Sequence, residues 1–163
     1  RGVDIRIIMP GIPDKKMIFR MSHSFYPVLL EAGVKIYEYI PGFVHAKGCL
    51  MDDKVCAVGT VNLDYRSLFL HFENNSLFYG ASLLQDMKAD FLDTQEKSRE
   101  MVLGENVKVG FWHWTVDGIL RILLRYVKRS ARLLTEPGTS FEYPLFFLPV
   151  LFVPVQLVVV LPA

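Results

Sequence analysis

The feature that most constrains the fold of this chain is an alternation of strand-like and helix-like segments over its first hundred residues. Residues 3–9 are rich in β-branched side chains and are followed by Pro10-Gly11, which is typical of a strand that ends in a turn. Residues 22–32 carry apolar side chains at helical spacing and are followed by a glycine, which predicts a helix that begins at Ser22 or near Pro27. Residues 34–39 alternate apolar and polar side chains, as a strand with one solvated face does.

The same pattern continues further along the chain. Residues 46–51 and 55–61 are strand-like runs joined by a short polar turn, which predicts a hairpin. Residues 70–79 predict another strand, and residues 82–102 predict a helix with a charged outer face. Strands and helices that alternate in this way favour an α/β fold with a mixed sheet sandwiched by helices.

The composition excludes some classes of protein. Of the 163 residues, 52% are hydrophobic and 21% are charged, so the chain is too apolar to be intrinsically disordered. The 18 basic and 17 acidic residues leave a net charge of +1, which argues against a strongly basic nucleic-acid-binding protein. Cys49 and Cys56 form no disulfide framework and lack metal-ligand spacing, so we expect reduced thiols in a cytosol-facing domain.

Changes in composition divide the chain into three regions. They are an α/β region over residues 1–110, a basic amphipathic helix over residues 111–134, and an apolar, proline-rich tail over residues 135–163. The chain opens at Arg1 inside the first strand-like run, without an initiator Met or a recognisable signal peptide. We therefore expect it to be a piece of a longer polypeptide.

The two C-terminal regions raise the question of a membrane. The basic helix could pack its apolar side on the core, or it could lie on an anionic membrane surface. In the tail, residues 145–161 are uncharged and just long enough to span a bilayer. Pro144, Pro149 and Pro154 would each interrupt a helix there, so a disordered or membrane-associated tail is expected in place of a regular spanning helix.

One group of residues forms a candidate active site. His45, Lys47, Asp52, Gly59 and Asn62 follow the pattern H-x-K-x4-D-x6-G-x2-N. Five specified residues at fixed offsets occur by chance at roughly one start position in a few million. Residues two apart on a strand share a face, so His45 and Lys47 are expected to project into the same pocket.

These side chains suit the transfer of a phosphoryl group. An imidazole can act as a nucleophile or a proton donor, and an adjacent ammonium stabilises the charge that develops on a phosphate oxygen. We expect Asn62 to donate an amide N–H to the same phosphate and Gly59 to permit the close approach of backbone or ligand. Asp52 is grouped with the catalytic residues as a support that fixes the hairpin turn or orients its neighbours.

The pattern is that of the HKD motif of the phospholipase D superfamily, which this chain resembles. The likeness is to the bacterial cardiolipin synthase branch in particular, and it is carried by residues 30–39, 42–47, 58–67, 70–74 and 86–91. It covers about residues 1–134 and corresponds to the C-terminal half of a two-motif enzyme. The resemblance implies a phospholipase D-like sheet that forms one half of a pseudo-two-fold pair.

The resemblance also implies an activity. Members of this type join two phosphatidylglycerol molecules into cardiolipin and release glycerol through a phosphohistidine on one motif, while the other motif's histidine serves as acid and base. The resemblance favours the acid/base role for His45 and leaves the nucleophile role open. It also implies that Lys47 and Asn62 contact the phosphate. Glu73 falls where the superfamily carries a carboxylate that hydrogen-bonds a motif histidine. No metal or other cofactor is implied.

The implied partners are phosphatidylglycerol and anionic membrane lipids, together with the N-terminal HKD half of the enzyme or a second copy of the chain. The implied location is the cytosolic side of the bacterial inner membrane, and no nucleic acid is expected. One alternative is a single-motif nuclease or phosphodiesterase that completes its site by forming a homodimer. Another is an inactive, lipid-binding fragment. The sequence leaves open whether the acceptor is phosphatidylglycerol, phosphatidylethanolamine or another lipid alcohol.

Overall fold

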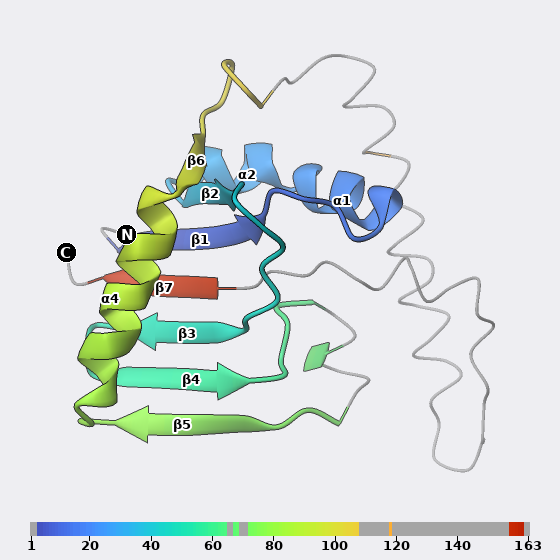
Figure 1. The fold of residues 1–163 in the computed structure, drawn as a ribbon. Helices are drawn as coiled ribbons and strands as arrows, with labels where there is room; N and C mark the ends of the chain where they lie inside the picture. The colour runs from blue at the N-terminus through green and yellow to red at the C-terminus, as the bar shows by residue number, and fades with distance from the viewer. Residues whose placement is uncertain (1–2, 65–66, 69–71, 108–117, 119–156, 162–163) are drawn as a thin grey trace, which may run out of the picture.

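The computed structural model describes residues 3–64, 67–68, 72–107, 118 and 157–161. Within these residues, seven strands form a mixed sheet in the order β5-β4-β3-β7-β1-β2-β6, and helices cover both of its faces (Figure 1). The α/β fold expected from the sequence, with a mixed sheet between helices, is confirmed.

The elements follow the chain in the order of their labels in Figure 1. The strands are β1 (Asp4–Pro10), β2 (Lys35–Tyr39), β3 (Gly48–Met51), β4 (Val55–Gly59), β5 (Asn75–Tyr79), β6 (Ser98–Met101) and β7 (Leu157–Leu161). The helices are α1 (Lys16–His23), α2 (Tyr26–Glu31) and α4 (Leu83–Glu96).

Strands β1 and β2 are parallel neighbours, and the chain passes between them through α1 and α2. Pro27 stands in the first turn of α2, where a missing backbone N–H breaks no helical hydrogen bond. Gly33, with a φ of 86°, follows this helix in the left-handed conformation that favours glycine. Both expected strands are confirmed within one residue at each end.

Strands β3 and β4 form the expected hairpin, and β5 adds to it antiparallel on the outer side. The turn contains Asp52 and Asp53 with φ values of 50° and 54°, a conformation that aspartate tolerates better than most residues. The Lys54 N–H closes the turn by donating to the Met51 carbonyl at 3.0 Å. Of the strand expected over residues 70–79, the part from Asn75 onward is confirmed.

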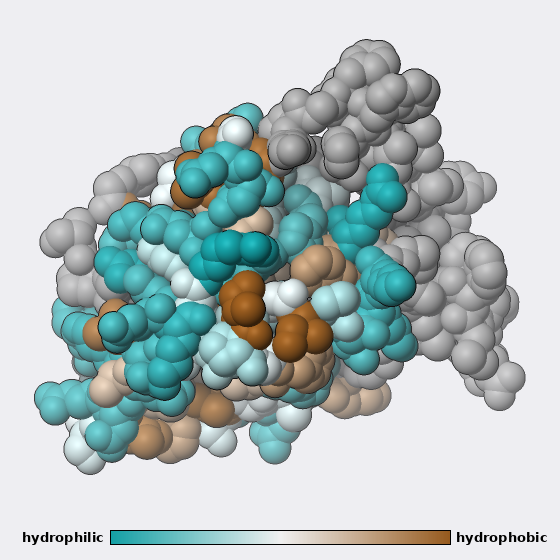
Figure 2. Space-filling model, turned by 45° about the horizontal axis from the view of Figure 1, so that its top comes forward, coloured by the Kyte–Doolittle hydropathy of each residue, from teal (hydrophilic) through white to brown (hydrophobic). Residues whose placement is uncertain are grey.

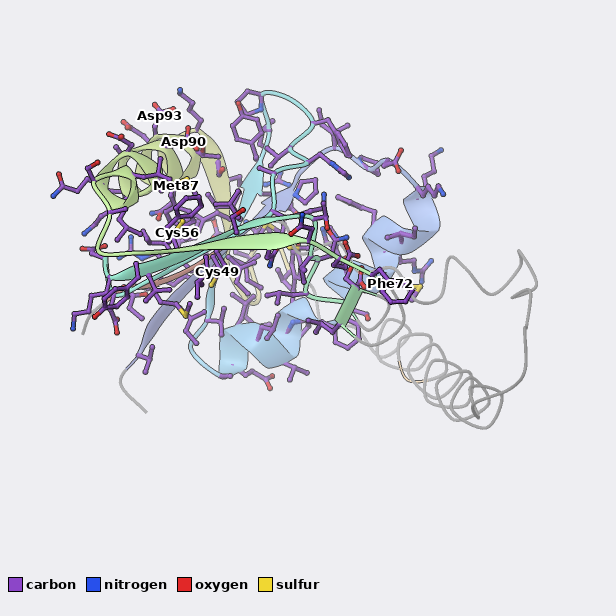
Figure 3. The ribbon with its side chains drawn as sticks, turned by 90° about the horizontal axis from the view of Figure 1, so that it is seen from below. Cys49, Cys56, Phe72, Met87, Asp90 and Asp93 are labelled. Carbon is purple, nitrogen blue, oxygen red and sulfur yellow. The ribbon has the colours of Figure 1, made fainter. Side chains whose placement is uncertain are left out.

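Alternate side chains of the central strands build a core layer on each face of the sheet. On one face Ile8, Tyr37 and Leu50 pack with Leu84 and Phe91 of α4. In the edge-on view of Figure 3, Met87 of α4 lies toward the sheet, whereas Asp90 and Asp93 point away from it. This accounts for the charged outer face that the sequence predicted for this helix.

The opposite face carries the second layer. There Ile7, Met9 and Ile36 pack with Tyr26 of α2 and with Met101. Figure 3 shows α2 and α4 on opposite sides of the sheet. The two helices therefore cover the two apolar faces, as a three-layer α/β fold requires.

The two cysteines face opposite sides of the β3–β4 hairpin. Cys56 pairs with Leu50, the neighbour of Cys49, so the two thiols alternate across the sheet. Both cysteines are free; Cys56 is buried and Cys49 is partly buried. They do not form a disulfide, as expected.

Two helix predictions were wrong in extent. The helix expected over residues 22–32 is two helices, and the first begins at Lys16, where the buried side chains Ile18 and Met21 mark its inner face. The helix expected over residues 82–102 ends at Glu96, and the chain continues as β6. Two of the four residues of β6, Arg99 and Glu100, are charged. Met101 pairs with Ile36 and is buried, and this pairing makes the segment a strand of the sheet.

The C-terminal tail contributes a strand to the middle of the sheet. β7 is antiparallel to β1 and parallel to β3, and its residues pair with both neighbours. The expectation of a disordered or membrane-associated tail is therefore wrong for Leu157–Leu161. A strand at these residues also excludes a helix running through to residue 161.

Within the described ranges, no helix is long and apolar enough to cross a bilayer. The predicted basic helix and residues 135–156 lie outside the described residues, apart from Gly118.

Candidate active site

One edge of the sheet gathers the loops that carry the candidate residues. β3, β4 and β5 are successively antiparallel, so the start of β3, the end of β4 and the start of β5 lie together. β1 and β2 also end at this edge, because β7 is antiparallel to β1 and parallel to β3. In Figure 1 this edge is on the right of the sheet, and we call it the loop edge.

His45 and Lys47 lie next to each other at the loop edge. β3 begins at Gly48, two residues later than expected, so both side chains belong to the segment that leads into the strand. The Lys47 Nζ lies 3.0 Å from Nδ1 and 3.1 Å from Nε2 of His45, and it donates to the His45 carbonyl at 2.9 Å. The imidazole is exposed, so a ligand in solution can reach both groups at once.

Hydrogen bonds connect this pair to the neighbouring strands. The Gly59 N–H donates to the Lys47 carbonyl at 3.3 Å, and the Thr60 N–H donates to the Asn74 carbonyl at 3.0 Å. The Thr60 hydroxyl accepts from the Asn74 N–H at 3.0 Å and donates to the Glu73 carboxylate. Glu73 is thus held at the loop edge beside the end of β4.

Gly59 stands where two backbones come very close. A Cβ at this position would lie 2.1 Å from the Asn74 carbonyl oxygen and 2.7 Å from the Asn75 Cα. No side chain fits there, so the glycine permits the approach of the segment that carries Glu73.

Asn62 belongs to a small buried polar cluster just beyond β4. Its Nδ2 donates to the Ser67 hydroxyl at 3.4 Å, and the Ser67 N–H donates to Asp64 Oδ1 at 2.7 Å. All three residues are buried, and the Asn62 Oδ1 has no hydrogen-bond partner among the described residues. Asp64 and Ser67 were not predicted from the sequence, although their spacing from Asn62, two and five residues on, could have drawn attention to them.

Two carboxylates act on the Lys47 ammonium. Burial lowers the pKa of Lys47, while the negative charges of Glu73 and Asp64 raise it, and the net shift is downward. A lysine whose pKa responds to both burial and nearby carboxylates, in contact with a histidine, is typical of a functional site. The loop edge thus brings a lysine ammonium and an exposed imidazole together, which suit an anionic ligand such as a phosphate. The Asn62 amide donates instead to Ser67 in the buried cluster beyond β4.

Asp52 lies away from this group. It occupies the turn at the far end of β3, and the strand between it and Lys47 puts the two Cα atoms roughly 16 Å apart at about 3.3 Å per residue. The structure therefore does not bring Asp52 to His45. Its position agrees with the expected support of the hairpin turn and not with a contact to substrate.

An apolar hollow adjoins His45. It is shallow, with an enclosed space of about 50 Å³, and it runs between the end of β1, α1 and the segment before His45. The residues that line it include Met9, Ile12, Ile18, Phe19 and Phe43. The Phe43 and His45 rings are stacked with centroids 6.0 Å apart, so the hollow begins at the imidazole.

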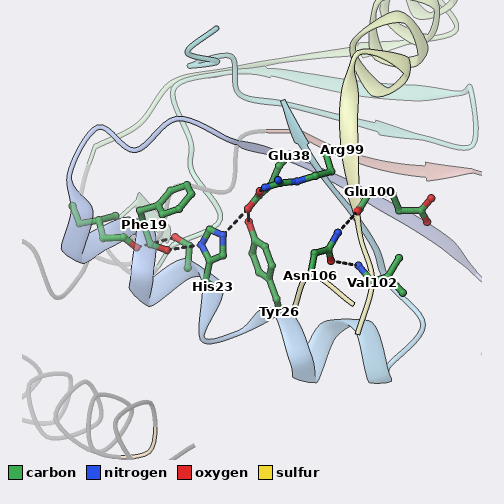
Figure 4. Close-up of polar contacts among 10 residues, drawn as sticks. Phe19, His23, Tyr26, Glu38, Arg99, Glu100, Val102 and Asn106 are labelled. Atoms are coloured by element: carbon green, nitrogen blue, oxygen red, sulfur yellow. Dashed lines mark hydrogen bonds and ion pairs between the residues drawn. The ribbon is translucent and has the colours of Figure 1, made fainter. Parts of the chain in front are cut away.

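A second polar cluster lies between α1, β2 and β6 (Figure 4). The buried Glu38 carboxylate accepts hydrogen bonds from Tyr26 at 3.3 Å and Arg99 at 2.8 Å and contacts His23 Nε2 at 2.5 Å. His23 Nδ1 lies 2.8 Å from the Phe19 carbonyl oxygen. These contacts tie β2 to the helices and to β6, which makes the cluster a structural support of the fold.

No three His, Cys, Asp or Glu side chains of the described ranges form a group that could hold a metal ion. The loop edge presents the His45 imidazole and the Lys47 ammonium, with the Glu73 carboxylate held beside the end of β4.

The fold and the histidine–lysine pair define a phospholipase D-like domain. A family model described as the phospholipase D-like domain of cardiolipin synthase matches residues 1–94. This is more than half of the chain, and the chain belongs to that family.

Individual relatives agree with this assignment. The chain is 56% identical to an uncharacterized protein of Streptococcus mutans over 101 residues, which are 62% of this chain and 22% of that protein. It is 44% identical to cardiolipin synthase 2 of Bacillus anthracis and 38% identical to the cardiolipin synthase of Alkalihalophilus pseudofirmus. Each of these two matches covers 122 residues, 75% of this chain and 24% of the relative.

The chain therefore spans about a quarter of the length of the curated relatives it matches. No solved structure matches it.

Proposed function

We propose that this chain supplies one of two HKD motifs to an enzyme that transfers a phosphatidyl group between two phosphatidylglycerol molecules. The products are cardiolipin and glycerol. Membership of the cardiolipin synthase family and the names of two relatives support this substrate class. The observation that carries the proposal is the contact between the Lys47 ammonium and the His45 imidazole at the open loop edge.

The reaction proceeds in two displacements. In the first, a motif histidine attacks the phosphorus, the bond to the glycerol oxygen breaks, and the second histidine gives its proton to the departing alkoxide. In the second displacement, the proton-donating histidine takes a proton from the hydroxyl of another phosphatidylglycerol. The oxygen of that hydroxyl attacks the phosphorus, and the bond between the phosphorus and the first histidine breaks. We assign the acid/base role to His45.

The neighbours of His45 have distinct roles in this scheme. The Lys47 ammonium neutralises charge on the non-bridging phosphate oxygens, and the Asn62 amide contributes a hydrogen bond to the same group. Glu73 and Asp64 oppose the effect of burial on Lys47 and so favour its charged form. The second HKD motif comes from the N-terminal half of the enzyme or from another copy of the chain. The enzyme acts at the cytosolic face of the bacterial inner membrane, where phosphatidylglycerol is its partner.

A chimera tests the substrate and the reaction. This chain replaces the matching segment of the Bacillus anthracis cardiolipin synthase 2, and the product is incubated with phosphatidylglycerol vesicles. We expect cardiolipin and glycerol in equal amounts, and a loss of about 10²-fold or more in rate for Lys47→Ala. The matched control is Lys54→Ala, an exposed lysine at the opposite end of the hairpin, which should leave the rate unchanged.

Other outcomes would contradict the proposal. Equal rates of cardiolipin formation by Lys47→Ala and Lys54→Ala would contradict the assignment of Lys47 to the active site. A stable homodimer of the chain that cleaves DNA, with no lipid product from the chimera, would favour the single-motif nuclease.

A further inference from the structure

The hollow beside His45 has apolar walls from three parts of the chain. Met9 and Ile18 are buried at 4% and 7% exposure, and they belong to β1 and α1. Ile12 and Phe43 stand at the rim with 43% and 50% of their surfaces exposed. Figure 2 shows hydrophobic residues as small islands within a mostly hydrophilic surface.

The buried polar atoms in the walls are already occupied. The Ser22 hydroxyl donates to the Ile18 carbonyl at 3.1 Å, and the Tyr26 hydroxyl donates to Glu38 at 3.3 Å. Both hydroxyls donate to a group within the protein, so neither hydroxyl hydrogen is available to a ligand. The interior of the hollow therefore presents mainly carbon to whatever enters it, which disfavours a polyol such as glycerol.

The charged groups of the hollow are at its mouth. Asp14 and Lys15 are exposed, and so is His45, whose ring stacks on Phe43. A ligand with a phosphate at Lys47 and a hydrocarbon portion attached to it would meet charge at the mouth and carbon inside. The hollow is shallow, and its enclosed space of about 50 Å³ has room for the first few methylene groups of a chain but not for a whole ligand.

We propose that the hollow binds the first part of one acyl chain of the phospholipid whose phosphate lies at His45 and Lys47. The inference rests on the proposed function, because it takes the ligand to be a phospholipid. It assigns Ile12 and Phe43 as residues that recognise the acyl chain. Neither residue takes part in the chemical steps.

Binding of single-chain lipids to the full 163-residue chain tests this. The probes are glycerophosphoglycerol, which has no acyl chain, and lysophosphatidylglycerols with four to eight acyl carbons, used below the concentration at which they aggregate. Burial of each methylene group in an apolar site strengthens binding by up to about fourfold. We expect the dissociation constant, measured by titration calorimetry, to fall by about two- to fourfold per added methylene.

Variants at the rim locate the effect. Ile12→Ser and Phe43→Ser should reduce the gain per methylene while leaving the affinity for glycerophosphoglycerol unchanged. The matched control is Ile40→Ser, which alters an equally exposed isoleucine, 46% against 43%, that is not in the walls of the hollow. All three positions are at the surface, so these variants should retain the fold, which circular dichroism checks.

The possible failures are distinguishable. The acyl-chain site is wrong, and the proposed function stands, if glycerophosphoglycerol binds as tightly as the eight-carbon lysophosphatidylglycerol. The same holds if Ile40→Ser reduces the gain in affinity per methylene as much as Ile12→Ser does. If none of the probes binds, the acyl-chain site is wrong. If Lys47→Ala leaves the binding of glycerophosphoglycerol unchanged, the proposed function fails together with the acyl-chain site.

Discussion

Gly59 marks the closest approach between β4 and the segment that leads into β5. A methyl group there would lie 2.1 Å from the Asn74 carbonyl oxygen, so Gly59→Ala has to push that backbone away. We expect a loss of about 1–3 kcal/mol in the free energy of unfolding, measured by urea denaturation. The displaced segment carries Glu73, so the chimera should also lose activity.

Gly42→Ala is the matched control for this variant. A Cβ at Gly42 meets only the Tyr39 Cε1, at 3.8 Å, which is an ordinary contact. Its stability should change by less than about 0.5 kcal/mol. Equal stability of the two variants would contradict the close approach at Gly59.

The buried Glu38 carboxylate gives the fold a defined dependence on pH. Burial raises the pKa of Glu38, but hydrogen bonds from His23 and Arg99 outweigh this, and the net pKa lies below 4.5. The unfolded chain therefore takes up a proton at a higher pH than the folded protein does. The stabilisation by this carboxylate is present above pH 4.5 and is lost as the pH falls through the lower folded pKa.

Glu38→Gln should remove this contribution. We expect the wild-type protein to be more stable than the variant at pH 5, and the difference to shrink as the pH falls toward 3. Urea denaturation over this pH range measures the difference. Glu100→Gln, which alters an exposed carboxylate of β6 next to Arg99, is the control. A difference between wild type and Glu38→Gln that does not change with pH would contradict the account.

The sequence predicted part of the site at the level of single residues. His45 and Lys47 follow from the motif, and their side chains are in contact although the segment that carries them is not part of β3. Asp64 and Ser67 were missed because their short spacing from Asn62 is the one signal that the sequence offers, and polar residues in a loop give no sign of burial. The separation of Asp52 from His45 follows only from knowing that β3 runs between them.

At the level of elements, β7 joins β1 to β3 in the middle of the sheet. Residue 159 pairs with Arg6 of β1 and Leu50 of β3, so a proline there removes a backbone donor from the middle of the sheet. We expect Val159→Pro to cost about 3 kcal/mol or more and to expose the amides of β1 and β3 to hydrogen exchange.

Val159→Thr is the control, because a β-branched residue is compatible with a central strand. It should retain most of the protection of β1 and β3. Full protection of both strands in Val159→Pro would show that β7 does not occupy the middle of the sheet.

Local patterns predicted the elements whose partners are near in the chain. β1, β2 and the β3–β4 hairpin have clear periodicity and turns, and they were identified within one or two residues at most ends. β6 was missed because its charged residues continue the polar pattern of α4, and only its pairing with β2 makes it a strand. β7 was missed because an apolar run is equally compatible with a membrane segment, and its partners lie more than a hundred residues away.

At the level of the whole molecule, the predicted basic segment offers a test of membrane binding. It carries arginines at helical spacing, including Arg121, Arg125 and Arg129, and lies outside the described residues. Basic residues near an anionic membrane contribute about 1 kcal/mol each. Replacing these three arginines with Glu should therefore weaken partition into phosphatidylglycerol vesicles by about 10²-fold or more, measured by sedimentation.

A variant with the same change in net charge controls for general electrostatic attraction. Lys16, Arg20 and Lys54 are exposed residues of the described fold, and their replacement with Glu should have a smaller effect. Equal partition of the two triple variants would contradict a specific membrane contact by the basic segment.

The central claim is that His45 takes part in phosphatidyl transfer at the loop edge. The measurement that tests it most directly is the rate of glycerol release from phosphatidylglycerol vesicles by the chimera, compared with its His45→Ala variant. Loss of a general acid and base predicts a fall of about 10²–10⁴-fold, with the fold and the vesicle binding unchanged. Release of glycerol by His45→Ala at the rate of the unmodified chimera would contradict the claim.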